Sequence, residues 1–181
     1  MNAPDKIENG SGTKRFQAKR DAILAAAADA INEQSAKGMT FADVARRVGL
    51  NTTSVTYYFK RKEDLAAAAF EQTLERLDAM LDEALEEATP EARVARFLHI
   101  NMARLARIDR GEEKAFAILS DLRAMEEPMK GQLLTGWRNI FRKTRSLWGA
   151  PANRAALAAA PETLAPLKGL MQAAGLAAAA A

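Results

Sequence analysis

The chain contains no cysteine and a single histidine among its 181 residues. Without cysteine it forms no disulfide, holds no thiolate zinc site or iron–sulfur cluster, and has no thiol nucleophile. A single histidine also excludes metal sites that need several histidines. Aromatic residues make up only 6% of the chain, which is few for an all-β protein, whereas alanine and leucine dominate and favour helices.

Long apolar runs are missing as well. No stretch of about 18 or more apolar residues free of charge and proline is present, so no transmembrane helix is expected. Residues 1–13 are polar, contain Pro4, Gly10 and Gly12, and lack the apolar core of a secretory signal. We therefore expect a soluble, cytoplasmic protein without a membrane partner, in which residues 1–13 form a disordered arm.

Charge is distributed unevenly along the chain. The formal net charge of the whole chain is +3, but residues 14–62 hold ten basic and four acidic residues, a net charge of +6. The remainder is therefore mildly acidic. A basic segment joined to an acidic body is typical of a nucleic-acid-binding module attached to a second unit. A solvated basic face explains the charge alone equally well.

Helical periodicity runs through most of the chain. Apolar spacing predicts a first helix over residues 14–34, with Gly38 available for a left-handed turn after it. Four more helices are predicted further along, over residues 63–88, 91–109, 112–125 and 128–148. Their lengths and short links predict an all-α helical bundle.

Residues 40–50 predict a short helix that is capped at both ends. Thr40 is a suitable N-cap, with Asp43 at the third helical position. Val44 and Val48 lie on the apolar stripe, and Gly49 closes the helix. A helix of barely two turns is unstable alone, so we expect it to pack against neighbouring helices.

The next segment, residues 52–59, is rich in residues that favour strands. We predict a helix instead, because a capped helix and a glycine turn precede it and because Val55 and Phe59 are four residues apart. Both side chains then share one face and belong to the core. A short helix, a tight turn and a second helix with outward hydroxyls and aromatic rings form a helix-turn-helix.

The outward side of this second helix carries groups that DNA recognition uses. An α-helix fits the major groove, hydroxyls bond to base edges, and tyrosine hydroxyls reach phosphates. Core packing is the alternative for the tyrosines, and simple helix capping is the alternative for Thr40, whose helix start also suits a phosphate. The candidate DNA-binding residues from this reasoning are Thr40, Thr52, Thr53, Ser54, Thr56, Tyr57 and Tyr58.

Three sequence elements combine in this region: Thr40-Phe41-Ala42-Asp43-Val44-Ala45, then Gly49-Leu50 with Val55 and Tyr58-Phe59, then Lys60-Arg61-Lys62-Glu63-Asp64-Leu65. In this combination, residues 14–70 resemble the tetracycline-repressor (TetR) family of bacterial transcription regulators. One position departs from the family pattern, because Thr56 stands where a tyrosine commonly contacts a phosphate.

The resemblance implies a division of labour along the chain. Residues 14–62 are then a three-helix DNA-binding head, and residues 63–181 are an effector-binding and dimerisation domain. It also implies a homodimer on a palindromic operator of double-stranded DNA, a repressor that a small-molecule effector releases, and a phosphate contact by Lys62.

Within the implied effector domain, five side chains are candidates for lining a cavity: His99, Met102, Phe116, Trp137 and Phe141. Ordinary core packing, or solvent exposure for the histidine, is the alternative. No catalytic residue, metal site or cofactor motif is recognised, and we expect none. Two other functions stay open, namely a helical protein–protein adaptor with an incidental basic face and a helical-bundle enzyme. The enzyme needs clustered inward carboxylates with histidine, which the sequence does not offer.

Overall fold

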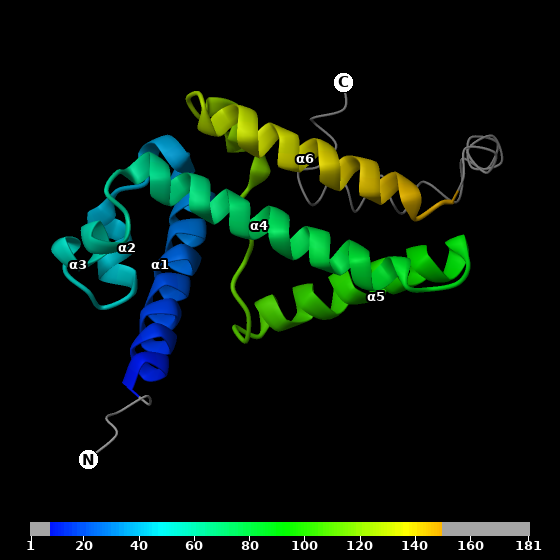
Figure 1. Cartoon of the computed structure of the whole chain (residues 1–181), viewed down its shortest axis with the longest axis horizontal. Coiled ribbons are helices and arrows are strands. Elements are labelled where there is room, and N and C mark those ends of the chain that lie inside the picture. Colours follow the sequence, from blue (N-terminus) through cyan, green and yellow to red (C-terminus); the bar gives the residue numbers. More distant parts are fainter. Residues whose placement is uncertain (1–7, 150–181) are drawn as a thin grey trace, which may run out of the picture.

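The computed structural model describes residues 8–149, which form six α-helices and one 3-10 helix without any strand (Figure 1). The expected all-α fold is confirmed for these residues. The alanine-rich residues 150–181 and residues 1–7 lie outside the described part of the chain. The elements are α1 (Glu8–Gly38), α2 (Phe41–Arg47), α3 (Thr52–Tyr58), α4 (Lys62–Leu85), α5 (Pro90–Asp109), η1 (Leu119–Ala124) and α6 (Met129–Ser146).

The long helix α4 is the centre of the fold. Figure 1 shows α1 crossing α4 near its start, with α2 and α3 beyond that crossing, while α5 and α6 flank the rest of α4. Leu65, Phe70 and Leu81 on α4 are almost fully buried. One continuous apolar core therefore connects the α1–α3 unit with α5 and α6, and both units use the same helix.

The start and the end of α1 differ from the sequence-based expectation. The helix begins at Glu8, so residues 8–13 are helical rather than part of a disordered arm. Adding residues to an existing helix costs less than nucleating one, which explains why two glycines do not stop it. The residue with a positive φ is Ser35 (φ 69, ψ 163) rather than Gly38. With this conformation at Ser35, the amide of Ala36 donates to a carboxylate oxygen of Asp121 at 2.7 Å.

The helix predicted over residues 112–125 is wrong. The chain is extended up to Ile118, and only η1 follows as a 3-10 helix. The side-chain amide of Asn32 on α1 donates to the carbonyl of Phe116 at 2.8 Å and its oxygen accepts from the amide of Ile118 at 2.8 Å. These tertiary hydrogen bonds satisfy backbone groups that a helix would otherwise pair, and so they override the local preference.

Residues 8–149 lack both a membrane-crossing helix and a metal-binding cluster. No helix there is long and apolar enough to cross a membrane. The same residues contain no group of three or more histidine, aspartate and glutamate side chains placed to hold a metal ion.

Candidate nucleic-acid interface

The helices α2 and α3 both start on side-chain caps. The hydroxyl of Thr40 accepts from the amide of Asp43 at 3.2 Å and donates to the Asp43 carboxylate at 2.6 Å, so its capping role is confirmed. Asn51 caps α3, because its side-chain oxygen accepts from the amide of Ser54 at 2.7 Å. The sequence analysis did not select Asn51 as a cap.

The turn between α2 and α3 is tight. Gly49 takes the left-handed conformation, with φ +65, which a residue with a Cβ rarely adopts. The amide of Leu50 then reaches back to the carbonyl of Ala45 at 2.9 Å, and the leucine side chain packs against the core. This geometry turns the chain from α2 into α3 and completes the helix-turn-helix.

One face of this unit is buried and the other is open, as the sequence predicted. Val55 is fully buried and Phe59, at the end of α3, is 7% exposed; both belong to the same core cluster as Val44. Tyr57 on the opposite side is 67% exposed. Burial of two apolar side chains therefore fixes which residues of α3 face outward.

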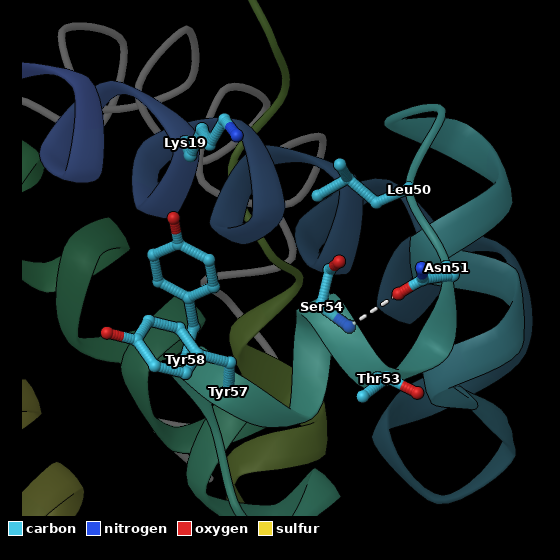
Figure 2. Close-up of a pocket in the computed structure, with 7 residues that line it drawn as sticks. All are labelled: Lys19, Leu50, Asn51, Thr53, Ser54, Tyr57 and Tyr58. Carbon is cyan, nitrogen blue, oxygen red and sulfur yellow. Dashed lines mark hydrogen bonds between the residues drawn. The ribbon is translucent and has the colours of Figure 1, made fainter.

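The outward residues of α3 surround a hollow of about 400 Å³ between α3 and α1 (Figure 2). Thr56 does not line it, and its hydroxyl donates to the carbonyl of Thr53 at 2.9 Å. Thr40, Thr52 and Lys62 also lie outside the lining. The hollow is lined by Lys19, Leu50, Asn51, Thr53, Ser54, Tyr57 and Tyr58.

Lys19 is the lining residue that comes from α1, and sequence reasoning did not select it. Three aromatic rings hold this part of α1 against α3. The ring centroids of Phe16 and Tyr58 are 4.7 Å apart, and those of Phe16 and Tyr57 are 6.3 Å apart in an edge-on arrangement. Phe16 precedes Lys19 by three residues, so the two side chains share a helix face. That spacing was the available signal.

Several cations of the basic segment already have partners. Arg47 forms a two-pronged ion pair with Glu33, at 3.0 and 2.5 Å, and this hydrogen bonding lowers the pKa of Glu33 and raises that of Arg47. Arg46 pairs with Asp43 at 2.9 Å. Arg61 lies 3.5 Å from a carboxylate oxygen of Glu63. These pairs reduce the positive charge that is free to attract an anion.

Lys62 has an intramolecular partner that the sequence did not indicate. Its ammonium group donates to the carbonyl of Lys37 at 2.8 Å and so ties the start of α4 to the end of α1. An ammonium group carries three donors. One hydrogen bond therefore leaves donors of Lys62 available for a second acceptor such as a phosphate.

The five candidate effector residues differ in their exposure to solvent. Met102 is 56% exposed, Phe141 is 42% exposed and His99 is also exposed. Trp137 is half-buried against the core. Phe116 is half-buried on the segment between α5 and η1, where its ring packs against Arg104 of α5.

Phe116 instead belongs to a charged cluster beside α5. The guanidinium of Arg104 lies 3.2 Å from the centre of the Phe116 ring, and Arg104 donates to the carboxylate of Glu113 at 2.8 Å. Arg107 donates to the second oxygen of Glu113 at 2.9 Å. Burial lowers the pKa of Arg104, and the nearby Glu113 opposes that shift. The cluster fixes the start of the extended segment.

Comparisons with known proteins agree with this geometry. Residues 23–69, which span the end of α1 and the helix-turn-helix, match the family model described as bacterial regulatory proteins, tetR family. HTH-type transcriptional regulator RutR of Escherichia coli strain K12 is 29% identical over 93 residues, which are 51% of this chain and 44% of that protein. RutR of Shigella flexneri matches to the same extent. The chain thus spans less than half the length of these curated relatives.

A solved structure shares the fold. The TetR family transcriptional regulator PfmR from Thermus thermophilus superposes with a TM-score of 0.57 at 22% identity, over 71% of this chain and 68% of that chain. The N-terminal part of this chain is a helix-turn-helix unit that resembles the TetR family, and over the 71% of the chain that superposes the fold is similar to that of PfmR.

Proposed function

We propose that the chain is a sequence-specific DNA-binding transcriptional regulator whose helix α3 enters the major groove. The observation that carries this proposal is the two-sided α3, which buries Val55 in the core and leaves Tyr57 67% exposed. A helix anchored in this way presents its outward side chains to a groove of matching width.

The base-reading and phosphate-binding residues follow from this placement. Thr53 and Tyr57 are exposed and Ser54 and Tyr58 are half-buried, and all four line the hollow beside α1. Thr40 and Lys62, at the starts of α2 and α4, are proposed as phosphate contacts in addition to their intramolecular bonds. The proposed DNA-binding set is Thr40, Thr52, Thr53, Ser54, Thr56, Tyr57, Tyr58 and Lys62.

The proposed regulator acts as a homodimer and as a repressor that a small molecule releases. Two-fold symmetry then places one α3 in each half-site of a palindromic operator. Exposed apolar side chains on α5, Met102 at 56% and Leu105 at 50%, support contact with a second copy or an effector. An effector lowers operator affinity when it binds best to a dimer whose two DNA-binding heads are spaced wrongly for the operator. By linkage, the operator then lowers effector affinity by the same factor.

The relatives support a regulator rather than an enzyme, since the proteins that this chain matches are named transcriptional regulators. The division of the chain is also a proposal. Residues 14–62 form the DNA-binding part, residues 63–181 form the effector and dimerisation part, and α4 packs against helices of both.

The test is selection of bound sequences from random duplex DNA by the full chain, followed by titration of the selected operator at several salt concentrations. A dimer that neutralises about 6–8 phosphates gives a plot of log K against log salt concentration with a slope of roughly −5 to −7. We expect two inverted half-sites and one dimer per operator by light scattering. A slope near zero on every duplex contradicts DNA binding and favours the adaptor.

A further inference from the structure

The hollow between α1 and α3 has the chemistry of an anion site. No acidic residue lines it, and its polar groups are an ammonium, a side-chain amide and hydroxyls. Figure 2 shows Lys19 on α1 facing the residues of α3 across the hollow. Because the lining comes from both helices, a ligand seated there contacts α1 as well as the recognition helix.

Lys19 is one of the cations of the basic segment whose side chain has no hydrogen-bond or ion-pair partner in the described fold. Within residues 8–149 no hydrogen bond or ion pair engages its ammonium group, whereas Arg46 and Arg47 each have a carboxylate partner. The side chain one turn earlier on the same face is Arg15, another cation. Lys19 thus keeps its full charge for an external anion.

Asn51 presents a donor at the other side of the hollow. Its side-chain oxygen is used in capping α3, where it accepts from the amide of Ser54 at 2.7 Å. That bond leaves the NH₂ group of Asn51 as its free polar end, and NH₂ can only donate. The hydroxyls of Ser54 and Tyr58 add two further donors to the lining.

The aromatic contacts hold α1 at the required distance. Phe16 packs on Tyr58 with ring centroids 4.7 Å apart, so the α1 turn that carries Lys19 is fixed beside α3. When α3 lies in the major groove, the backbone of the DNA runs along the sides of that helix. The hollow lies on the α1 side of α3, where a phosphate of that backbone can enter it.

We propose that a backbone phosphate of bound DNA occupies this hollow, held by Lys19 of α1 and by the amide of Asn51. Helix α1 is then part of the DNA interface, and Lys19 fixes the position of α3 in the groove without reading bases. This inference rests on the proposed function. Its test separates the two, because the proposed function fails only when the unmodified chain binds no duplex.

The first experiment compares operator affinity of the full chain with that of Lys19→Ala, Lys19→Arg and Arg142→Ala across a salt series. Arg142 on α6 is exposed and its guanidinium bonds to Asn139, so its loss removes the same charge outside the head. Lys19→Ala should weaken binding about tenfold, equally on operator and random duplex, and flatten the salt slope by about two per dimer. Lys19→Arg should retain most of the affinity, and Arg142→Ala should bind like the unmodified chain.

Asn51→Asp sharpens the comparison. Aspartate caps a helix as well as asparagine does, so the melting curve should be unchanged, but a carboxylate replaces the donor and repels a phosphate. We expect a larger loss of affinity than for Lys19→Ala, without loss of fold. Asn51→Asp that binds operator as tightly as the unmodified chain overturns the site.

The second experiment neutralises one operator phosphate at a time with methylphosphonate linkages. In the unmodified chain, one phosphate in each half-site should be costly to neutralise, and in Lys19→Ala that same cost should vanish. If neutralising each phosphate weakens the binding of Lys19→Ala as much as it weakens the binding of the unmodified chain, the inference is overturned. A change in the preferred bases of Lys19→Ala, or an unchanged salt slope in that variant, overturns it as well. Both variants must melt like the unmodified chain, as expected for exposed side chains at these two positions.

Discussion

The α1–α3 head and the segment between α5 and α6 meet the hydrogen-bonding needs of their backbones in opposite ways. In the head, Thr40 and Asn51 each cap a helix through an amide only three residues away. Between α5 and α6, the backbone of Phe116 and Ile118 is paired by Asn32, more than 80 residues earlier in the chain. The helix caps of the head are local, whereas the backbone of the other segment is paired by a residue of α1.

This difference has a consequence for how the two regions are coupled. The extended segment is bound to α1 through Asn32 and to α4 through Thr73, whose hydroxyl accepts from the amide of Ala117 at 3.1 Å. The carboxylate of Asp121 also accepts from the amide of Ala36 at the kink of α1. These hydrogen bonds join the segment between α5 and α6 directly to α1 and α4, in addition to its contacts with Arg104 of α5.

The largest expected effect is a loss of stability caused by a substitution in the core of the head. Phe59→Ala removes a buried ring and should destabilise the fold by about 3–5 kcal/mol, because the cavity adds to the lost transfer energy. Phe141→Ala makes the same change on α6, where the ring is 42% exposed, and serves as the control. Urea unfolding curves of both variants decide the matter, and equal losses would show that the ring of Phe59 does not anchor the head.

The next effect tests the non-local segment. Asn32→Ala removes both bonds to the extended backbone and leaves half-buried groups unpaired, which should cost about 1–3 kcal/mol. Asn32→Asp keeps the acceptor for the amide of Ile118 but places a carboxylate against the carbonyl of Phe116, so it should not restore stability. Thermal melting gives the values.

Asn139 offers the matched control for this substitution. It lies exposed on α6, and its side chain accepts a hydrogen bond from Arg142 at 3.2 Å. Asn139→Ala should therefore change the free energy of unfolding by no more than about 0.5 kcal/mol. If Asn32→Ala melts like Asn139→Ala, the extended segment does not depend on α1 in the way described.

A smaller effect is expected at Lys62, which has one role inside the fold and one proposed role outside it. Lys62→Ala should cost roughly 0.5–1.5 kcal/mol through the lost bond to the carbonyl of Lys37. It should also flatten the salt slope of DNA binding by about one per subunit. Lys60→Ala, at an exposed neighbour, is the control for stability. A changed melting curve with an unchanged slope would leave Lys62 a purely structural residue.

The head was predictable because its signals are short-range. The cap at Thr40, the glycine turn and the four-residue spacing of Val55 and Phe59 lie within one stretch of sequence, and each was confirmed. The hollow was only half predictable. Its α3 residues follow from that spacing, whereas Lys19 joins them through packing of Phe16 that no local pattern reveals.

The predicted helix over residues 112–125 failed for the opposite reason. Its apolar residues have helical spacing, but Asn32 on α1 and Thr73 on α4 provide better partners for its backbone. The partners are distant in sequence, so periodicity cannot report them. Phe116 was grouped with the effector candidates because no sequence pattern pairs it with Arg104, which covers its ring.

The smallest expected change in stability belongs to Tyr57, on the open side of the helix that Phe59 anchors. Its side chain is 67% exposed and meets the rings of Phe16 and Tyr58 edge-on, so Tyr57→Ala should alter the free energy of unfolding by about 0.5 kcal/mol or less. Operator binding should nevertheless weaken by about 1–3 kcal/mol for each base position that the ring contacts. Each variant needs a melting curve and a titration with the selected operator, with Phe59→Ala as the reference. Tyr57→Ala that melts as early as Phe59→Ala would place the ring in the core, and Tyr57→Ala that binds operator like the unmodified chain would take this side of α3 out of the groove.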